Sequence, residues 1–474
     1  MIQLQNVSFQ YQYQSKKALN AIDLEISAGE VIVLCGKSGC GKTTITRLLN
    51  GLIPYYINGE LQGTIRVANQ DIQAMEIHEI SKLTGSVFQN PKTQFYNIDT
   101  DSELVFTVEN FGLPSDEILN RKAMMVEQFE LQPLLQRNLF HLSGGEKQRI
   151  ACASVAIHNP PIIILDEPTA NLDNEATAQL GEMIAFWKSQ GKTIVISEHR
   201  LHYLQNLADR FVYLEDGQIK HIFAQKEMLT MSNEALYQLG LRAIHLEEVM
   251  PQHDRLLDQG ARFKLETLSY FNHDFQLKIE GFDLPFPAIM AITGHNGAGK
   301  STFAKALTGL NRKVSPTFHI NNVKFRKKQC LQASSMVMQD VHHQLFTESV
   351  LAEILLSMPE PNEELALDLL ALLGASELKD AHPLALSGGE KQRVAILSAI
   401  AADKQVMIMD EPTSGLDYHH MRKFANCMNI LRNQNKLVFI ITHDPEMIAL
   451  CCDGTIELSQ GMMKDITLFN KQRV

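Results

Sequence analysis

The stretch GKSGCGKT at Gly36–Thr43 returns later in the chain as GHNGAGKS at Gly294–Ser301. Each copy follows a short β-branched, apolar run that predicts a buried strand, and each leads into residues with helical spacing. A glycine-rich loop between a strand and a helix is typical of a site for nucleotide phosphates. The strand and helix are expected over Val31–Cys35 and Thr43–Leu49 in the first copy, and over Ala288–Thr293 and Ser301–Leu307 in the second.

Further landmarks recur in the same order in both halves of the chain. From the LSGG segment onward, corresponding residues stay 244 positions apart, whereas the second copy is shorter upstream, as loops allow. An internal repeat of this kind predicts two domains of one fold. The paired landmarks are Lys42 and Lys300, Gln89 and Gln339, Ser143 and Ser387, Glu167 and Glu411, and His199 and His443.

The fold class follows from buried strands that alternate with helical segments. Two further pairs of short apolar runs end at Asp-Glu-Pro or at a histidine. Strands separated by helices predict an α/β fold with a mostly parallel sheet, in which ligands bind beyond the carboxyl ends of the strands. These runs are Ile162–Leu165, Val406–Met409, Thr193–Ser197 and Leu437–Thr442.

The repeat sets the expected domain boundaries at 1–222 and 263–474. The intervening residues 223–262 match none of the repeated motifs. Because they are polar and compatible with helix, we expect them to be a linker.

Composition excludes several classes of protein. The net charge of −11 argues against sequence-independent binding to nucleic acid. No run of about 18 apolar residues occurs, so we expect no membrane-spanning helix. The N-terminal MIQLQNVSFQ has the pattern of a strand, which argues against a secretory signal.

The two glycine-rich loops supply the chemistry of phosphate binding. Glycines allow successive backbone N–H groups to approach a phosphate chain, a lysine adds charge at the β- and γ-phosphates, and a hydroxyl is offered to Mg²⁺. The residues in these roles are Gly36, Gly39, Gly41, Lys42 and Thr43 in the first copy, and Gly294, Gly297, Gly299, Lys300 and Ser301 in the second.

Carboxylates and histidines at neighbouring strand ends predict a hydrolytic site. Asp166 and Asp410 are candidates for Mg²⁺ binding. A glutamate follows each aspartate and is the candidate general base for the attacking water. Gln89 and Gln339 are candidates for contacting metal or water, and His199 and His443 for contacting the γ-phosphate. The glutamates are Glu167 and Glu411.

The identical segments LSGGEKQR at Leu142–Arg149 and Leu386–Arg393 predict a second anion-binding element in each half. A serine and two glycines that open a helix present free N–H groups to a phosphate. Since each domain already has a phosphate loop, we expect these segments to contact the nucleotide held by the other half. They contribute Ser143, Gly144 and Gly145, and Ser387, Gly388 and Gly389.

With these motifs in this order, the chain resembles the ATP-binding cassette ATPases twice over, along almost its full length. The resemblance implies two tandem P-loop NTPase domains, each with a RecA-like sheet, an antiparallel β subdomain and an α-helical subdomain. It also implies ATP and Mg²⁺ as cofactors, with Mg²⁺ bound through Thr43, Gln89 and Asp166 and through Ser301, Gln339 and Asp410. Further nucleotide contacts implied in this way are Tyr11, Ser38, Cys40, Thr44, Asn296, Ala298 and Thr302.

The segments Val87–Asn97 and Val337–Val350 resemble the ATPases of energy-coupling factor transporters, and Glu103–Pro114 and Ser197–Leu204 resemble the fused members of that group. This resemblance implies uptake of a vitamin, a vitamin precursor or a metal ion at the cytoplasmic face of the membrane. The implied partners are an integral membrane scaffold and a separate substrate-binding membrane subunit. The alternatives are the ATPase of another importer, such as a sugar importer, and a soluble twin-cassette factor that acts on ribosomes.

The two halves differ where the family stacks an aromatic ring on adenine. Tyr11 fits this role in the first half, but the corresponding frame LSYFN places Asn272 there in the second half. Tyr270 and Phe271 are the candidates to replace it. Since both halves keep the catalytic glutamate and the histidine, we predict two hydrolytically competent sites.

Overall fold

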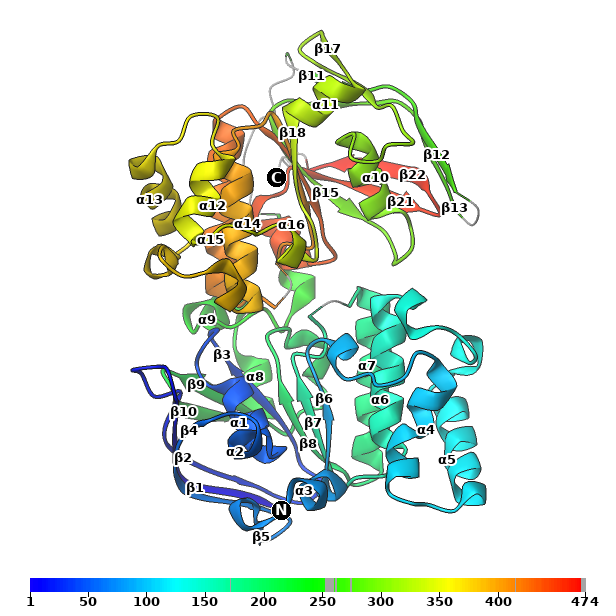
Figure 1. Cartoon of the computed structure of the whole chain (residues 1–474), viewed down its shortest axis with the longest axis vertical. Coiled ribbons are helices and arrows are strands. Elements are labelled where there is room, and N and C mark those ends of the chain that lie inside the picture. Colours follow the sequence, from blue (N-terminus) through cyan, green and yellow to red (C-terminus); the bar gives the residue numbers. More distant parts are fainter. Residues whose placement is uncertain (171, 252–259, 261, 273–274, 414, 470–474) are drawn as a thin grey trace. The chain divides into compact units, whose positions relative to one another are not determined.

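The computed structural model describes residues 1–474 except 171, 252–259, 261, 273–274, 414 and 470–474. The chain divides into two compact units, Met1–His245 and Leu246–Val474 (Figure 1). Each unit combines a mostly parallel core sheet with an antiparallel sheet and a group of helices. The duplicated α/β fold predicted from the repeat is therefore confirmed.

The core sheet of the first unit has six strands in the order β10-β9-β3-β8-β7-β6. All neighbours in this sheet are parallel except the pair β9 and β10. Strands β3 and β8 are buried along their whole length, as expected for apolar runs covered on both faces. The strands are β3 (Val31–Gly36), β6 (Thr84–Val87), β7 (Ile162–Asp166), β8 (Thr193–Ser197), β9 (Arg210–Glu215) and β10 (Gln218–Ala224).

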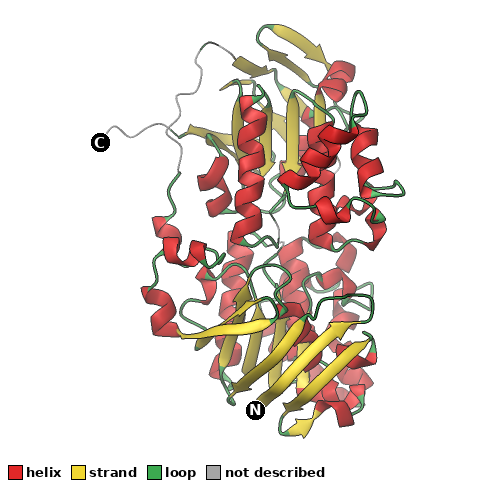
Figure 2. Cartoon of the chain, turned by 90° about the vertical axis from the view of Figure 1, so that its left-hand side faces the viewer, coloured by secondary structure: helices red, strands yellow, loops and turns green. Residues whose placement is uncertain are grey.

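An antiparallel sheet in the order β2-β1-β4-β5 completes the β structure of this unit and lies beside the N-terminus in Figure 2. Its buried side chains join those of β3 and β8 in one apolar cluster, so the two sheets share a core. The strands are β1 (Ile2–Tyr11), β2 (Leu19–Ile26), β4 (Gly59–Val67) and β5 (Gln70–Asp71).

The helices of the first unit begin where the sequence provides caps. The side chains of Asp99, Ser143 and Asp173 each accept a hydrogen bond from a backbone N–H in the first turn of the helix that follows. Three of these helices, α4, α5 and α6, contact one another and form the helical region (Figure 1). The helices are α1 (Lys42–Leu49), α2 (Leu52–Tyr55), α3 (Ile77–Leu83), α4 (Thr100–Asn110), α5 (Ser115–Gln128), α6 (Gly144–Ala156), α7 (Asn174–Ser189), α8 (Gln225–Thr230) and α9 (Asn233–Gln238).

The structure differs from the sequence expectation at the proposed linker, 223–262. Residues 223–245 belong to the first unit, where they end β10 and form α8 and α9. The reason is apolar side chains spaced along a polar segment: Met228, Leu236, Leu241 and Ile244 are buried in the core of that unit. The remainder of the expected linker includes 252–259 and 261, which lie outside the described residues.

The second unit repeats this plan with one change. The counterpart of β1 is interrupted, so that its first part, β11, lies in a four-stranded sheet of order β14-β11-β16-β17. Its second part, β12, forms a hairpin with β13, which joins the core sheet by pairing Lys278 with Met462. The four strands are β11 (Arg262–Leu265), β14 (Phe282–Pro285), β16 (Thr317–Ile320) and β17 (Val323–Arg326).

The core sheet of the second unit consequently has eight strands, in the order β12-β13-β22-β21-β15-β20-β19-β18. They are β12 (Leu268–Asn272), β13 (Phe275–Ile279), β15 (Ala288–Thr293), β18 (Ser334–Val337), β19 (Val406–Asp410), β20 (Leu437–Ile441), β21 (Gly454–Ser459) and β22 (Met462–Leu468). The helices are α10 (Lys300–Leu307), α11 (Lys327–Ala333), α12 (Val350–Ser357), α13 (Glu363–Leu372), α14 (Gly388–Ala401), α15 (Tyr418–Asn433) and α16 (Pro445–Cys451). In the described part of the chain, no helix has both the length and the apolar character needed to cross a membrane.

Candidate nucleotide sites

The loop between β3 and α1 has the backbone that a phosphate-binding loop needs. Gly36, Gly39 and Gly41 have φ values of 142°, 78° and 107°, in the region that favours glycine. A Cβ atom on Gly36 would lie 2.2 Å from the carbonyl oxygen of Leu214, on the adjacent strand β9. The tight turn out of the sheet therefore depends on this glycine.

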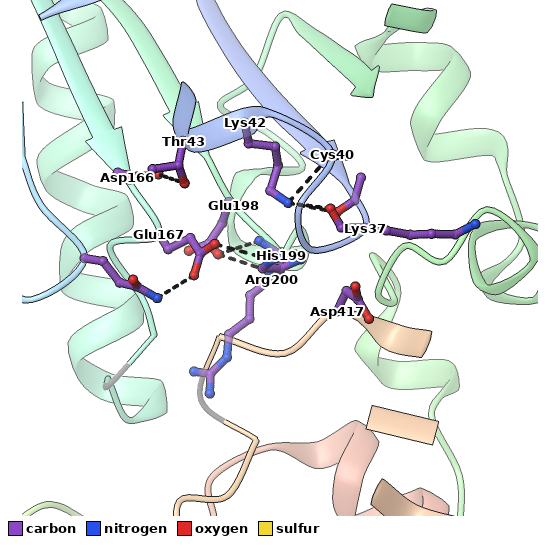
Figure 3. Close-up of polar contacts among 12 residues, drawn as sticks. Lys37, Cys40, Lys42, Thr43, Asp166, Glu167, Glu198, His199, Arg200 and Asp417 are labelled. Carbon is purple, nitrogen blue, oxygen red and sulfur yellow. Dashed lines mark hydrogen bonds and ion pairs between the residues drawn. The ribbon is translucent and has the colours of Figure 1, made fainter. Parts of the chain in front are cut away.

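The lysine of this loop is held by the loop itself (Figure 3). Lys42 is 4% exposed, and its Nζ donates to the carbonyl oxygens of Gly36 and Lys37 at 3.0 and 3.1 Å. Its positive charge is thus fixed inside the loop, where the sequence predicts a phosphate chain. Around it, Ser38 and Gly39 are exposed, whereas Cys40 is buried.

The loop before α10 in the second unit has the same construction. Gly294, Gly297 and Gly299 have φ values of 132°, 83° and 100°. The Nζ atom of Lys300 donates to the carbonyl oxygens of Gly294 and His295 at 2.6 and 3.0 Å. Of the other predicted contacts, Asn296 is exposed, Ala298 is buried and Thr302 is half-buried.

Tyr11 is the last residue of β1, and its side chain contacts the first turn of α1. Its hydroxyl is 3.0 Å from the hydroxyl of the buried Thr44 and accepts from the Arg47 guanidinium at 3.3 Å. In the second unit, Tyr270 is half-buried against the core and Phe271 is 71% exposed. Because side chains alternate along a strand, Tyr270 and Phe271 point to opposite faces of β12.

Each Asp-Glu step places its aspartate beside the hydroxyl of the glycine-rich loop. Thr43 Oγ1 donates to Asp166 Oδ1 at 3.2 Å (Figure 3), and Ser301 makes a hydrogen bond to Asp410 in the second unit. Hydroxyl and carboxylate oxygens are the ligands that Mg²⁺ prefers, so these residues fit the expected ion. Burial, with a contribution from Glu167, raises the pKa of Asp166 to about 6, and burial also raises the pKa of Asp410.

We expect Asp166→Asn to raise the thermal stability of the protein without Mg²⁺ or nucleotide at pH 8. A folded-state pKa of about 6, above the ordinary 3.8, means that folding favours the protonated form. The stabilisation is complete below about pH 4 and is lost as pH rises through 6. The asparagine side chain does not ionise, so the variant avoids this loss of unfolding free energy, which is at most about 3 kcal/mol. Thermal unfolding at pH 4 and pH 8 measures the effect, and a lower midpoint for the variant at pH 8 would contradict it.

Glu167 lies at the centre of the first site. It has a φ of 45°, and its N–H donates to the carbonyl oxygen of Ser197 at 2.8 Å, which fixes the turn after β7. Gln89 Nε2 donates to Glu167 Oε2 at 2.6 Å, and His199 Nε2 lies 3.4 Å from Glu167 Oε1. The structure thus brings together the glutamine, glutamate and histidine from the ends of β6, β7 and β8.

The second unit places the corresponding residues more loosely. Glu411 has a φ of 49°, and its N–H donates to the carbonyl oxygen of Ile441 at 2.9 Å. His443 Nε2 lies 3.8 Å from Glu411 Oε1, and Gln339 is exposed after β18.

The two LSGG segments are fixed by their own helices. The Ser143 hydroxyl accepts from the N–H of Glu146 at 3.3 Å, and the Glu146 carboxylate accepts from the N–H of Ser143 at 2.7 Å. Ser387 and Glu390 repeat this capping box. Gly144 and Gly145 open α6, as Gly388 and Gly389 open α14. Each segment therefore presents a helix N-terminus, the element expected to bind a phosphate.

Residues on both sides of His199 were not among the predicted site residues. Glu198 and Arg200 are buried and make hydrogen bonds to the chain that follows Glu167. The sequence does contain a signal for them. The first half has Glu-His-Arg where the second half has Thr-His-Asp, so that two charged residues directly follow a strand expected to be buried.

Known proteins are similar to this chain in sequence and in fold. The model of the ABC transporter family matches residues 19–170 and 277–414. Two Treponema denticola proteins named ABC transporter ATP-binding protein are 40% and 36% identical to this chain. The alignments cover 97% and 98% of this chain and 96% of each relative. A Methanosarcina mazei protein of the same description is 29% identical over 97% of the chain and 88% of its own length.

Two solved structures resemble the whole chain. An archaeal ABCE1, from a model of ribosome-bound Pelota and ABCE1, gives a TM-score of 0.72 at 21% identity, covering 98% of this chain and 78% of that one. A structure titled RNase-L Inhibitor gives 0.64 at 21% identity, covering 98% and 91%. Likeness at such identity shows the fold alone. The matches of the family model in both halves, and the relatives aligned along almost the entire chain, show that this chain belongs to the ABC transporter ATP-binding protein family.

Proposed function

We propose that this chain is the ATP-hydrolysing subunit of a membrane importer of the energy-coupling factor class, for a vitamin, a vitamin precursor or a metal ion. Family membership supports ATP hydrolysis by the two cassettes, 1–245 and 246–474. Coupling to an importer at the cytoplasmic face of the membrane is the further step in the proposal.

In the first cassette, the N–H groups of the glycine-rich loop and Lys42 bind the phosphates of ATP. Thr43, Asp166 and Gln89 would hold Mg²⁺, which would neutralise charge on the phosphates. Glu167 accepts the proton of the attacking water. His199, whose Nε2 lies 3.4 Å from Glu167 Oε1, orients the Glu167 carboxylate and contacts the γ-phosphate. The second cassette uses Lys300, Ser301, Asp410, Gln339, Glu411 and His443 in the same roles.

The family resemblance adds the role of the LSGG segments. Ser143, Gly144 and Gly145 contact the ATP bound at Lys300, and Ser387, Gly388 and Gly389 contact the ATP bound at Lys42. Both ATP molecules are then required for closure, and their hydrolysis releases the two cassettes from each other.

The observation that carries the importer proposal is a pair of exposed apolar surfaces that follow Gln89 and Gln339 in the sequence. In the first cassette, Tyr96 is 80% exposed, and its ring stacks on Phe106 with centroids 5.1 Å apart. The loop that carries Tyr96 is fixed by the buried side chain of Glu103, which accepts hydrogen bonds from the N–H groups of Tyr96 and Asn97 at 3.1 and 2.8 Å. A rigid loop that keeps an aromatic ring in solvent is suited to binding a partner.

The second cassette repeats this surface 250 residues later. Phe346 is 72% exposed and Leu356 is 64% exposed. Glu353, also buried, accepts from the N–H groups of Phe346 and Thr347 at 3.0 Å each. Two equivalent apolar surfaces, each with its aromatic residue seven positions after Gln89 or Gln339, favour a membrane scaffold that engages both cassettes.

We expect the double variant Tyr96→Ser, Phe346→Ser to lose co-purification with an integral membrane subunit. Both side chains are mostly exposed, so ATP binding and the unfolding temperature should stay near wild type. Affinity purification from solubilised membranes, with mass spectrometry of the captured proteins, measures the loss. The wild-type chain should capture a scaffold and a small substrate-binding membrane subunit.

Val323→Ser is the matched control, since Val323 is 60% exposed on β17 and does not belong to either surface. It should retain the membrane partners. Sedimentation of the wild-type chain with ribosomes and without membranes would overturn the proposal in favour of a twin-cassette ribosome factor. Capture of a transporter that lacks a separate substrate-binding membrane subunit would favour another importer class.

A further inference from the structure

The first cassette has a buried carboxylate next to its catalytic histidine. Glu198 is 2% exposed and lies between the end of β8 and His199. Its Oε2 accepts from the N–H groups of His199 and Arg200 at 2.6 and 3.2 Å (Figure 3). The carboxylate therefore fixes the backbone that carries the histidine.

The other oxygen of Glu198 reaches the chain that follows Glu167. Its Oε1 accepts from the N–H of Thr169 at 3.3 Å, from the Thr169 hydroxyl and from the Tyr203 hydroxyl at 3.2 Å. Thr169 is fully buried and lies two residues after Glu167. A single side chain thus connects the segment that carries the histidine to the segment that carries the glutamate.

Arg200 makes a second connection between the same segments. It is 9% exposed, and its Nη1 donates to the carbonyl oxygen of Leu172 at 3.0 Å. We name the bonds of Glu198 and Arg200 to Thr169 and Leu172 the brace. Hydrogen bonds with one ionised partner are stronger than those between neutral groups, so the brace is expected to hold both segments together.

The second cassette has different residues at the positions of Glu198 and Arg200. The positions 244 residues later hold Thr442 and Asp444. The side chain of an ionised aspartate has no N–H to donate to a carbonyl oxygen, and the side chain of a threonine has no second oxygen to bridge two segments. Instead, Thr442 Oγ1 accepts from the N–H of Asp444 at 3.1 Å, and Asp444 caps α16.

We propose that Glu198 and Arg200 are positioning residues that hold His199 against Glu167 in the first cassette, and that Thr442 and Asp444 do not repeat this bridge in the second. The two nucleotide sites then differ in how far they are arranged before ATP binds. The shorter approach of His199 to Glu167, 3.4 Å against 3.8 Å for His443 and Glu411, agrees with this difference. The proposal rests on the proposed function, in which these residues act on ATP.

The test transfers the second cassette's own residues into the first. The double variant Glu198→Thr, Arg200→Asp gives the first cassette the triplet Thr-His-Asp, which the second cassette accommodates. Glu198→Gln is the companion variant, because it keeps the shape of the side chain while replacing one acceptor oxygen with an NH₂ donor. The emission of Trp187, the chain's single tryptophan, reports whether the first cassette remains folded.

Hydrogen exchange of the full chain without nucleotide is the first measurement. We expect the amides of Thr169 and His199 to exchange about tenfold faster or more in the double variant, as for lost bonds to a charged group. The amides around Glu411 and His443 should keep their wild-type rates. Unchanged exchange at Thr169 and His199 would show that the brace does not hold these segments and would overturn the proposal. Loss of protection throughout the first cassette in both variants would also overturn it.

ATP hydrolysis is the second measurement. We expect kcat to fall about two- to tenfold while KM for ATP stays within about twofold, since positioning affects the reaction more than binding. Faster exchange with an unchanged kcat would reduce Glu198 and Arg200 to a structural role and overturn the proposal. If the wild-type chain does not hydrolyse ATP, the proposed function fails, while the exchange experiment still decides whether the brace exists.

Discussion

Replacing Glu167 and Glu411 together by glutamine is expected to lower ATP turnover by about 10²–10⁴-fold, the range for a lost general base. Glutamine keeps the size of the side chain but cannot take a proton from water. The residues that hold the phosphates are untouched, so ATP should stay bound and trap the closed form of the protein. Phosphate release and equilibrium ATP binding measure the two effects.

Glu109→Gln is the matched control, because Glu109 is an exposed carboxylate on α4 and its loss should leave turnover near wild type. The single variants Glu167→Gln and Glu411→Gln show how far each site works alone. Near-normal phosphate release by the double variant would exclude both glutamates as the base. Loss of ATP binding would show that they hold the nucleotide.

Arg432→Met is expected to destabilise the second cassette by about 3–5 kcal/mol, the cost of leaving one partner of a buried ion pair alone. Arg432 on α15 pairs with Asp453, and their side chains are 6% and 3% exposed. The other Asp453 oxygen accepts from the N–H of Ile289 at 2.8 Å, at the start of β15. The variant would leave a carboxylate buried beside the strand that leads into the second glycine-rich loop.

The first cassette offers the control for this change. Lys188 and Asp209 occupy the equivalent positions, and Asp209 accepts from the N–H of Val31 at 2.8 Å, but their side chains are 32% and 41% exposed. Lys188→Met should therefore cost only about 0–1 kcal/mol.

Chemical denaturation followed by two signals separates the cassettes. Trp187 reports the first cassette, while circular dichroism reports both. For Arg432→Met, the dichroism should show an early transition that Trp187 does not follow. Equal destabilisation by Arg432→Met and Lys188→Met would contradict the role given to burial.

The sequence predicted the parts of the fold whose signals are local. Val31–Cys35 and Ala288–Thr293 are largely apolar runs followed directly by glycine, and they form β3 and β15 within one residue of the expected bounds. The sequence also predicted that motifs at the ends of neighbouring parallel strands converge, and the structure adds the contacts of Thr43 with Asp166 and of His199 with Glu167, which the sequence did not specify.

Features that depend on tertiary packing were missed. Residues 223–245 look polar along the sequence, yet Met228 and Leu236 are buried against the first cassette. The interruption between β11 and β12 changes which sheet the second part joins, and no local pattern indicates it. The bond from Glu198 to Thr169 joins residues 29 positions apart, so only the folded chain reveals it.

The left-handed backbone at Glu167 and Glu411 sets activity against stability at two positions. Glycine would adopt these angles without steric cost, whereas a side chain there carries strain of about 1 kcal/mol. Because these glutamates are the proposed bases, a glycine at either position is expected to raise the free energy of unfolding and to lower ATP turnover. Selection for thermal robustness alone, as in a laboratory screen of unfolding temperature, would drive this ATPase toward inactive forms at these two turns.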